Sequence, residues 1–180
     1  MQKNNAALPH TKSVLLILCL LAISCSKSAT NDTQTAGATA EPPAIASTDV
    51  VKATPHEVTL ARGESADAVV SLKIANGYHV NANPPSYSYL KATELEIQPA
   101  AGIVVEFMTY PDALTKKFSF AEKPLAVYEG ETTLKARLKA DKTAAPGQHN
   151  LSAKLRVQAC DDKVCYAPGA VDLTVPVNIK

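Results

Sequence analysis

Residues 151–179, LSAKLRVQACDDKVCYAPGAVDLTVPVNI, contain two segments in which apolar and polar side chains alternate. The first runs from Leu151 to Ala159, and the second runs from Val171 to Ile179. Successive side chains of a β-strand point to opposite faces, so each segment predicts a strand with one dry and one wet face. Cys160 and Cys165 lie between the two segments, at the tip of the predicted hairpin.

Residues 56–139 contain further segments typical of β-strands. We expect further strands, from alternation or from apolar content, at residues 56–60, 70–74, 94–97, 103–110, 125–128 and 134–139. Turn-forming pairs such as Asn76-Gly77 and Pro146-Gly147 separate them. No segment shows the three- and four-residue spacing of an amphipathic helix. Seven to nine short strands predict an all-β fold, an immunoglobulin-like antiparallel β-sandwich.

The composition fits one folded domain and excludes two broad classes of protein. The chain has 180 residues, of which 46% are hydrophobic and 19% are charged. That apolar content is too high for a chain disordered throughout. The formal net charge of +1 gives no long-range field that would attract nucleic acid, so no nucleic-acid partner is expected.

The N-terminus predicts a lipoprotein signal peptide at residues 1–24. Val14–Ile23 is an unbroken apolar run of ten residues, which as a helix would reach about 15 Å, half of a hydrocarbon core. The run ends in Ala22-Ile23-Ser24 before Cys25, which resembles a bacterial lipobox with Cys25 as the lipidated residue. An ordinary secretory signal with an incidental cysteine is the alternative. Either way the chain is exported to a compartment where a disulfide can persist.

Residues 25–49 predict a flexible linker between the lipid anchor and the domain at residues 50–180. The segment is rich in Ser, Thr, Ala and Pro, and Ile45 is its only large apolar side chain. It cannot bury enough apolar surface to become ordered. Its coil dimension is about 27 Å, which would keep the domain near a membrane surface. Ser26 after the anchor favours the outer membrane by analogy with bacterial lipoproteins.

Three interpretations of Cys160 and Cys165 remain open from the residues alone. A structural disulfide would close a loop of about six residues and stabilise the fold by about 2 kcal/mol, at the low end for disulfides. A redox-active dithiol is the second interpretation. A two-thiolate metal site is the third, and it would need His79 or His149 as a further ligand, although neither has a recognisable spacing. Alternation also predicts that Cys160 points away from the dry face that holds Ala159.

Other candidate sites are weak. His56, His79 and His149 fall on different strands or turns, and we expect surface histidines satisfied by hydrogen bonds rather than ligands. The chain has no phosphate-binding glycine loop and no assignable catalytic triad. We therefore expect no metal and no cofactor.

Three segments resemble the N-terminal domain of the thiol:disulfide interchange protein DsbD. The segments are Gln158–Pro168 with both cysteines, Gly77–Leu95, and Lys117–Gly130 with its Phe118-Ser119-Phe120. Together the resemblance runs from about residue 50 to residue 180. The family fold is an immunoglobulin-like sandwich with a redox cysteine pair at one end, which agrees with the strand pattern.

The resemblance implies a function for the pair. Such domains carry electrons as a dithiol between thioredoxin-like proteins of the periplasm, by way of mixed disulfides. It implies that Cys165 bonds to partner proteins and that Cys160 resolves the mixed disulfide. It also implies that Phe118, with Phe120, belongs to a cap that shields the pair, and that Tyr166 packs near the sulfur. The domain would then be a component of a protein-disulfide reductase system.

This sequence departs from the family pattern in two respects. Four residues separate its cysteines, whereas some members have five. Whole DsbD proteins continue into membrane helices and a thioredoxin domain, so we expect a membrane electron donor that acts in trans on a monomeric, lipid-anchored domain. The alternative function is a non-catalytic binding or scaffold lipoprotein whose disulfide is purely structural.

Overall fold

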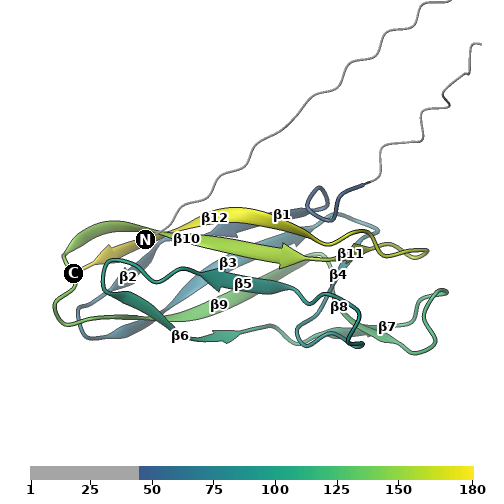
Figure 1. Cartoon of the computed structure of the whole chain (residues 1–180), viewed down its shortest axis with the longest axis horizontal. Helices are drawn as coiled ribbons and strands as arrows, with labels where there is room; N and C mark the ends of the chain where they lie inside the picture. Colours follow the sequence, from purple (N-terminus) through teal and green to yellow (C-terminus); the bar gives the residue numbers. More distant parts are fainter. Residues whose placement is uncertain (1–44) are drawn as a thin grey trace, which may run out of the picture. The chain divides into compact units, whose positions relative to one another are not determined.

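The computed structural model describes residues 45–180, which form three β-sheets (Figure 1). In chain order the strands are β1 (Val51–Pro55), β2 (Val58–Leu60), β3 (Ser65–Ile74), β4 (His79–Asn81), β5 (Glu94–Ile97), β6 (Ile103–Thr109), β7 (Leu114–Lys116), β8 (Leu125–Tyr128), β9 (Glu131–Ala140), β10 (Gly147–Val157), β11 (Ala159–Cys160) and β12 (Gly169–Ile179). The predicted signal peptide, Cys25 and the first part of the predicted linker lie outside the described residues. Within residues 45–180 no helix is long and apolar enough to cross a membrane.

Two large sheets form the sandwich. One has the strand order β1-β3-β9-β6 and the other has the order β2-β12-β10-β5. Their inner faces share one core of buried apolar side chains, among them Leu72, Leu134, Leu155 and Val175. This all-β, immunoglobulin-like sandwich confirms the predicted fold class. One pairing differs from the antiparallel expectation, because the short strand β2 runs parallel to the end of β12.

The hairpin expected between the two alternating segments is present. β10 and β12 pair antiparallel along their whole lengths, with Leu151 opposite Val175 and Leu155 opposite Val171. The odd-numbered residues of β10, from Leu151 to Val157, are buried, whereas their neighbours on the strand are more exposed. Period-two patterning therefore located these two strands and the face that each one buries.

A third, smaller sheet lies at the end of the sandwich where the cysteine hairpin turns. Its strand order is β11-β4-β8-β7, and it occupies the right-hand end of Figure 1, whereas the C-terminus lies at the left-hand end. β4, β7 and β11 have only two or three residues each, which is too short for alternation to reveal them. This sheet carries most of the candidate site.

The described fold begins before the predicted start of the domain at Val50. Residues 46–49 form a turn closed by a hydrogen bond from the Asp49 N–H to the Ala46 carbonyl. Ser47 is fully buried: its hydroxyl accepts from the Ala159 N–H and donates to the Ala167 carbonyl. Thr48 packs so closely on Gly169 that a Cβ there would lie 2.8 Å from the Thr48 methyl group. The chain therefore enters the fold beside the cysteine hairpin.

Candidate functional site

Cys160 and Cys165 form a disulfide across the tip of the hairpin. Their Cα atoms lie 3.9 Å apart, and the two residues also form an isolated antiparallel bridge. The disulfide that the structural and the redox interpretations both require is therefore present. Within residues 45–180 no group of three or more His, Cys, Asp or Glu side chains is arranged as metal ligands.

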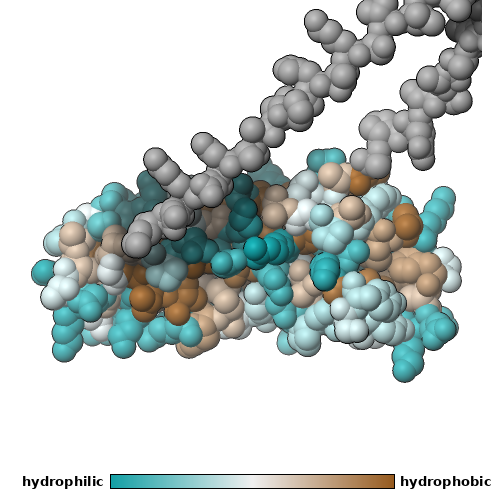
Figure 2. Space-filling model, in the orientation of Figure 1, coloured by the Kyte–Doolittle hydropathy of each residue, from teal (hydrophilic) through white to brown (hydrophobic). Residues whose placement is uncertain are grey.

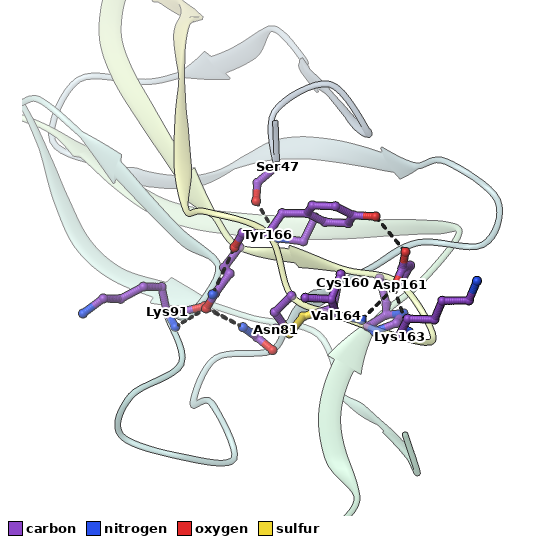
Figure 3. Close-up of a disulfide and its surroundings, with 12 residues drawn as sticks. Ser47, Asn81, Lys91, Cys160, Asp161, Lys163, Val164 and Tyr166 are labelled. Carbon is purple, nitrogen blue, oxygen red and sulfur yellow. Dashed lines mark hydrogen bonds between the residues drawn. A yellow bond between two sulfur atoms is a disulfide. The ribbon is translucent and has the colours of Figure 1, made fainter. Parts of the chain in front are cut away.

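A break at Gln158 moves the chain from the large sheet to the small one. β10 ends at Val157, and Ala159 and Cys160 then pair with β4 instead of continuing along β12. The Gln158 side chain stabilises this change of sheet by three hydrogen bonds (Figure 3). Its oxygen accepts from the Lys91 N–H and from the Asn81 amide, and its NH2 group donates to the Tyr166 carbonyl. The strand that presents Cys160 is thereby fixed by side-chain hydrogen bonds as well as by its ladder.

The two sulfur-bearing residues differ in exposure. Cys160 is 0% exposed, whereas Cys165 is partly exposed. Alternation does place Cys160 and His79 on the face opposite to Ala159 and Val80, which belong to the main core. Cys160 therefore points away from the face that holds Ala159, as predicted, and it is nevertheless buried. Residues distant in sequence cover it, so no local pattern could have shown the burial.

Asp161 organises the turn between the cysteines. One carboxylate oxygen accepts from the N–H groups of Lys163 and Val164, at 2.7 and 2.8 Å. The other oxygen accepts from the Tyr166 hydroxyl at 2.7 Å (Figure 3). These three hydrogen bonds, the one from Tyr166 first, lower the pKa of Asp161. The turn is therefore held by an ionised carboxylate at neutral pH.

Tyr166 follows the second cysteine but packs on the opposite side from the cap. Its ring is partly buried against the main core, with its centroid 6.1 Å from that of Tyr78. The hydrogen bond to Asp161 raises the pKa of Tyr166 to about 12. The structure thus ties Tyr166 to the cysteine turn through its hydroxyl, and the expected shielding role stays a prediction.

Residues 117–121, between β7 and β8, contain the two phenylalanines predicted to cap the cysteine pair, and we call them the cap segment. Phe118 is only 3% exposed and belongs to a small apolar cluster that Cys165 also contacts. Phe120 is 40% exposed and stacks on Phe118 with ring centroids 5.4 Å apart. The Ser119 hydroxyl donates to the Asp162 carbonyl and so joins the cap segment to the cysteine turn. Both predicted cap residues therefore lie at the site, with Phe118 inside and Phe120 outside.

Charged side chains surround the edge of this cluster. Lys116 donates to Glu129 at 2.6 Å, lies 3.9 Å from an Asp162 oxygen, and sits over the Phe118 ring at 5.6 Å from its centroid. The hydrogen bond to Glu129 raises the pKa of Lys116. The charges link β7, the end of β8 and the cysteine turn around the apolar cluster.

Of the three histidines in residues 45–180, one differs from the other two. His56 is exposed and bonds to the Ser71 hydroxyl, and His149 bonds to the Ala145 carbonyl, as expected of satisfied surface histidines. For His79 that expectation is wrong: the residue is 0% exposed and stacks on Phe118 with ring centroids 4.1 Å apart. The register of β4 against β11, which brings residues 79 and 160 together, buries it. The only sequence signal was that His79 falls within one of the three segments that resemble the family.

Apolar surface is exposed around Cys165. Tyr89, Phe120 and Val164 are exposed, and together with Lys163 they line a surface pocket to which Cys165 contributes. Figure 2 shows apolar side chains at this end of the molecule between hydrophilic ones. The partly exposed Cys165 thus lies beside an apolar rim formed by Tyr89, Phe120 and Val164.

The family described as thiol:disulfide interchange protein DsbD, N-terminal, matches residues 47–175 of this chain. The matched range includes both cysteines and the cap segment. Among curated protein sequences, none matches this chain.

Solved structures with a similar fold are distant in sequence. The N-terminal periplasmic domain of ScsB from Proteus mirabilis is 15% identical, with a TM-score of 0.47, and the alignment covers 71% of this chain and 45% of that chain. A family 123 glycoside hydrolase from Clostridium perfringens is 9% identical, with a TM-score of 0.35, and the alignment covers 73% of this chain and 27% of that one. This chain spans less than half the length of either structure.

Proposed function

Because this chain belongs to the family of N-terminal domains of the thiol:disulfide interchange protein DsbD, we propose that its Cys160–Cys165 pair exchanges electrons with thioredoxin-like proteins. The unequal exposure of the two cysteines is the observation that carries the proposal. Cys165 is partly exposed beside an apolar rim, and Cys160 is buried beneath it. Cys160 is fully buried, so the exchange starts at Cys165.

The reaction proceeds through a mixed disulfide. A partner thiolate attacks the Cys165 sulfur, the Cys160–Cys165 bond breaks, and its electron pair leaves on Cys160. A second thiolate of the partner then attacks the partner's own sulfur in the mixed disulfide, which releases Cys165 as a thiolate. The partner is oxidised to a disulfide and the domain is reduced to a dithiol. The reverse sequence passes the two electrons to an oxidised thioredoxin-like protein.

The cap segment controls access to the pair. Phe118 is buried in the apolar cluster that Cys165 contacts. A partner must therefore displace the Phe118 ring before its own sulfur can approach the Cys165 sulfur along the axis of the disulfide bond. The exposed rim of Tyr89, Phe120 and Val164 gives the partner an apolar surface on which to dock. Tyr166 and Asp161 hold the turn in place while the bond is exchanged.

We also propose where the domain acts in the cell. A signal peptide at residues 1–24 exports the chain to the periplasm, lipidated Cys25 anchors it to a membrane, with the outer membrane favoured, and the linker presents residues 50–180 as a monomer. The electron donor is a membrane protein acting in trans. The lipobox-like residues before Cys25 and the family membership support this arrangement.

Two measurements test the function. The reduction potential of the pair should lie between about −180 and −270 mV, the range of thioredoxin-like proteins, whereas a structural disulfide should lie below about −300 mV. A Cys160→Ala variant should trap a thioredoxin-like protein as a stable mixed disulfide through Cys165, and a Cys160→Ala/Cys165→Ser control should trap none. A potential below about −300 mV together with no trapped partner would establish the purely structural disulfide instead.

A further inference from the structure

His79 is a fully buried titratable side chain that has no role in the exchange steps proposed for the two cysteines. Within residues 45–180 neither ring nitrogen has a hydrogen-bond partner, and the nearest carboxylate oxygen, on Glu129, lies 4.0 Å from Nδ1. A buried polar atom without a partner destabilises the folded state. Such an atom in a folded protein calls for an explanation in strain, in chemistry or in a missing partner.

The position of His79 suggests the missing partner. In the antiparallel register of β4 and β11, His79 lies directly opposite Cys160. Side chains that face each other on neighbouring strands have Cβ atoms about 4.5–5.5 Å apart. Cys165 pairs with Cys160 on its other side, and Phe118 stacks on the imidazole. His79 and Cys160 are therefore neighbours on one face of the small sheet, and both are fully buried.

In the disulfide form the Cys160 sulfur carries no proton and gives the imidazole little to bind. Reduction changes that, because a thiol is a hydrogen-bond donor and a thiolate is an acceptor. A neutral imidazole offers one acceptor nitrogen and one N–H donor, so it can pair with Cys160 in either protonation state. The unsatisfied ring of the oxidised protein is thus a site that the reduced protein can satisfy.

Burial, more than the surrounding charges, favours the neutral form of the ring. Burial is the main cause that lowers the pKa of His79, and Lys116 of β7 adds to it. Glu129 after β8 and the cysteine-turn residues Asp161 and Asp162 act in the opposite direction. A neutral ring is the form that can accept a proton from a thiol.

We infer that His79 is the proton acceptor for the buried Cys160 thiol during disulfide exchange. The inference rests on the proposed function, and it assigns the step in which Cys160 resolves a mixed disulfide. The Cys160 proton moves to the imidazole, and the thiolate attacks the Cys165 sulfur. The bond between Cys165 and the partner breaks, its electron pair leaves on the partner sulfur, and the imidazolium then releases the proton to that sulfur or to water. The partner is reduced and the domain returns to the disulfide.

The test measures the titration of Cys160 without any partner. In the full chain with Cys19→Ser, Cys25→Ser and Cys165→Ala, Cys160 is the only remaining thiol of the four cysteines. Thiolate absorbance against pH should give an apparent pKa at or below the ordinary value near 8.5, because imidazole and thiolate titrate as a pair. Adding His79→Phe keeps an aromatic ring on Phe118 but removes the proton acceptor. The thiolate fraction at neutral pH should then fall about tenfold, which corresponds to one pKa unit.

A control variant and a second measurement separate the effect of His79 from a general effect of substitution. His56→Phe removes an exposed histidine bonded to Ser71 and should leave the Cys160 titration unchanged. If the His79→Phe chain does not fold, ring nitrogen NMR of His79 with both cysteines present should show a change in protonation or hydrogen bonding upon reduction. A His79→Phe titration equal to the parent, or a ring spectrum that reduction does not change, overturns the inference. Partner trapping by Cys160→Ala would survive that result, so the two proposals can fail separately.

Discussion

Between the two large sheets the buried side chains are apolar, whereas at the cysteine end buried polar side chains lie beside exposed apolar ones. All four polar side chains that are buried among the described residues belong to this end: Ser47, His79, Asn81 and Thr93. Phe120 and Val164 are exposed nearby. The main core stabilises the fold, and the cysteine end departs from the usual distribution of polar and apolar groups. Such departures are expected where a surface must react or bind.

The largest expected effect breaks the core and leaves the site intact. Leu155 is fully buried between the sheets, so Leu155→Ala should cost about 2–5 kcal/mol in the free energy of unfolding. The cavity left by the substitution lies in the main core, away from the two cysteines, so the reduction potential of the cysteine pair should not change. Urea unfolding and a redox titration against glutathione measure the two quantities. A shifted potential would mean that core and site are coupled.

The next effect comes from a polar side chain at the cysteine end. Ser47→Ala leaves the buried Ala159 N–H without its acceptor and should cost about 1–3 kcal/mol. Ser152→Ala on the exposed face of β10 is the matched control and should cost much less. Equal unfolding midpoints for the two variants would show that the hydrogen bonds of Ser47 do not hold the hairpin.

A smaller effect should appear in kinetics. Phe118→Ala removes the ring that stacks on His79 and that we propose shields the cysteine pair. Since an aromatic pair contributes about 0.5–1.5 kcal/mol beyond area burial, reduction of the disulfide by dithiothreitol should become roughly three- to tenfold faster. Phe120→Ala, which truncates the outer ring, should accelerate the reduction less. The cap assignment fails if the two variants react at the parent rate.

The smallest effect concerns the pH dependence of the cysteine turn. Asp161→Asn removes the negative charge beside the Tyr166 hydroxyl, so the pKa of Tyr166 should fall from about 12 toward its ordinary value near 10. Because the folded pKa is raised, the contribution of this contact to stability is present below about pH 10 and is lost as the pH rises toward 12. Phenolate absorbance, taken as the difference from Tyr166→Phe, follows the titration. An unchanged pKa in Asp161→Asn would show that Asp161 does not set it.

The sequence predicts the large sheets far better than the cysteine end. Alternation is a local property, so the segments of β3, β9, β10 and β12 could be read from their own residues. β4 and β11 have three and two residues, and only their pairing with each other defines them. The break at Gln158 likewise depends on Asn81 and Lys91, which lie far away in the sequence.

The site residues divide in the same way. The spacing of Cys160 and Cys165 allowed a disulfide, because four intervening residues can close a turn, but it also left a metal site open. The burial of Cys160 and His79 could not be derived, because their cover comes from Phe118 and from a register between residues about eighty positions apart. The resemblance to a family supplied Phe118, and no physical argument from the sequence alone would have placed it over the disulfide.

Because Ser47 binds beside the cysteine hairpin and the C-terminus lies at the opposite end, the choice of attachment point decides which end of an immobilised domain faces the solution. β12 starts at Gly169, beside Thr48, and its ten steps of about 3.3 Å carry the chain roughly 33 Å to the opposite end. If the domain were immobilised through residues 45–48, the Cys165 sulfur would lie near the support, where arriving molecules would reach it less easily. Coupling through Lys180 would leave that sulfur facing the solution, which makes the C-terminus the better handle for a biosensor.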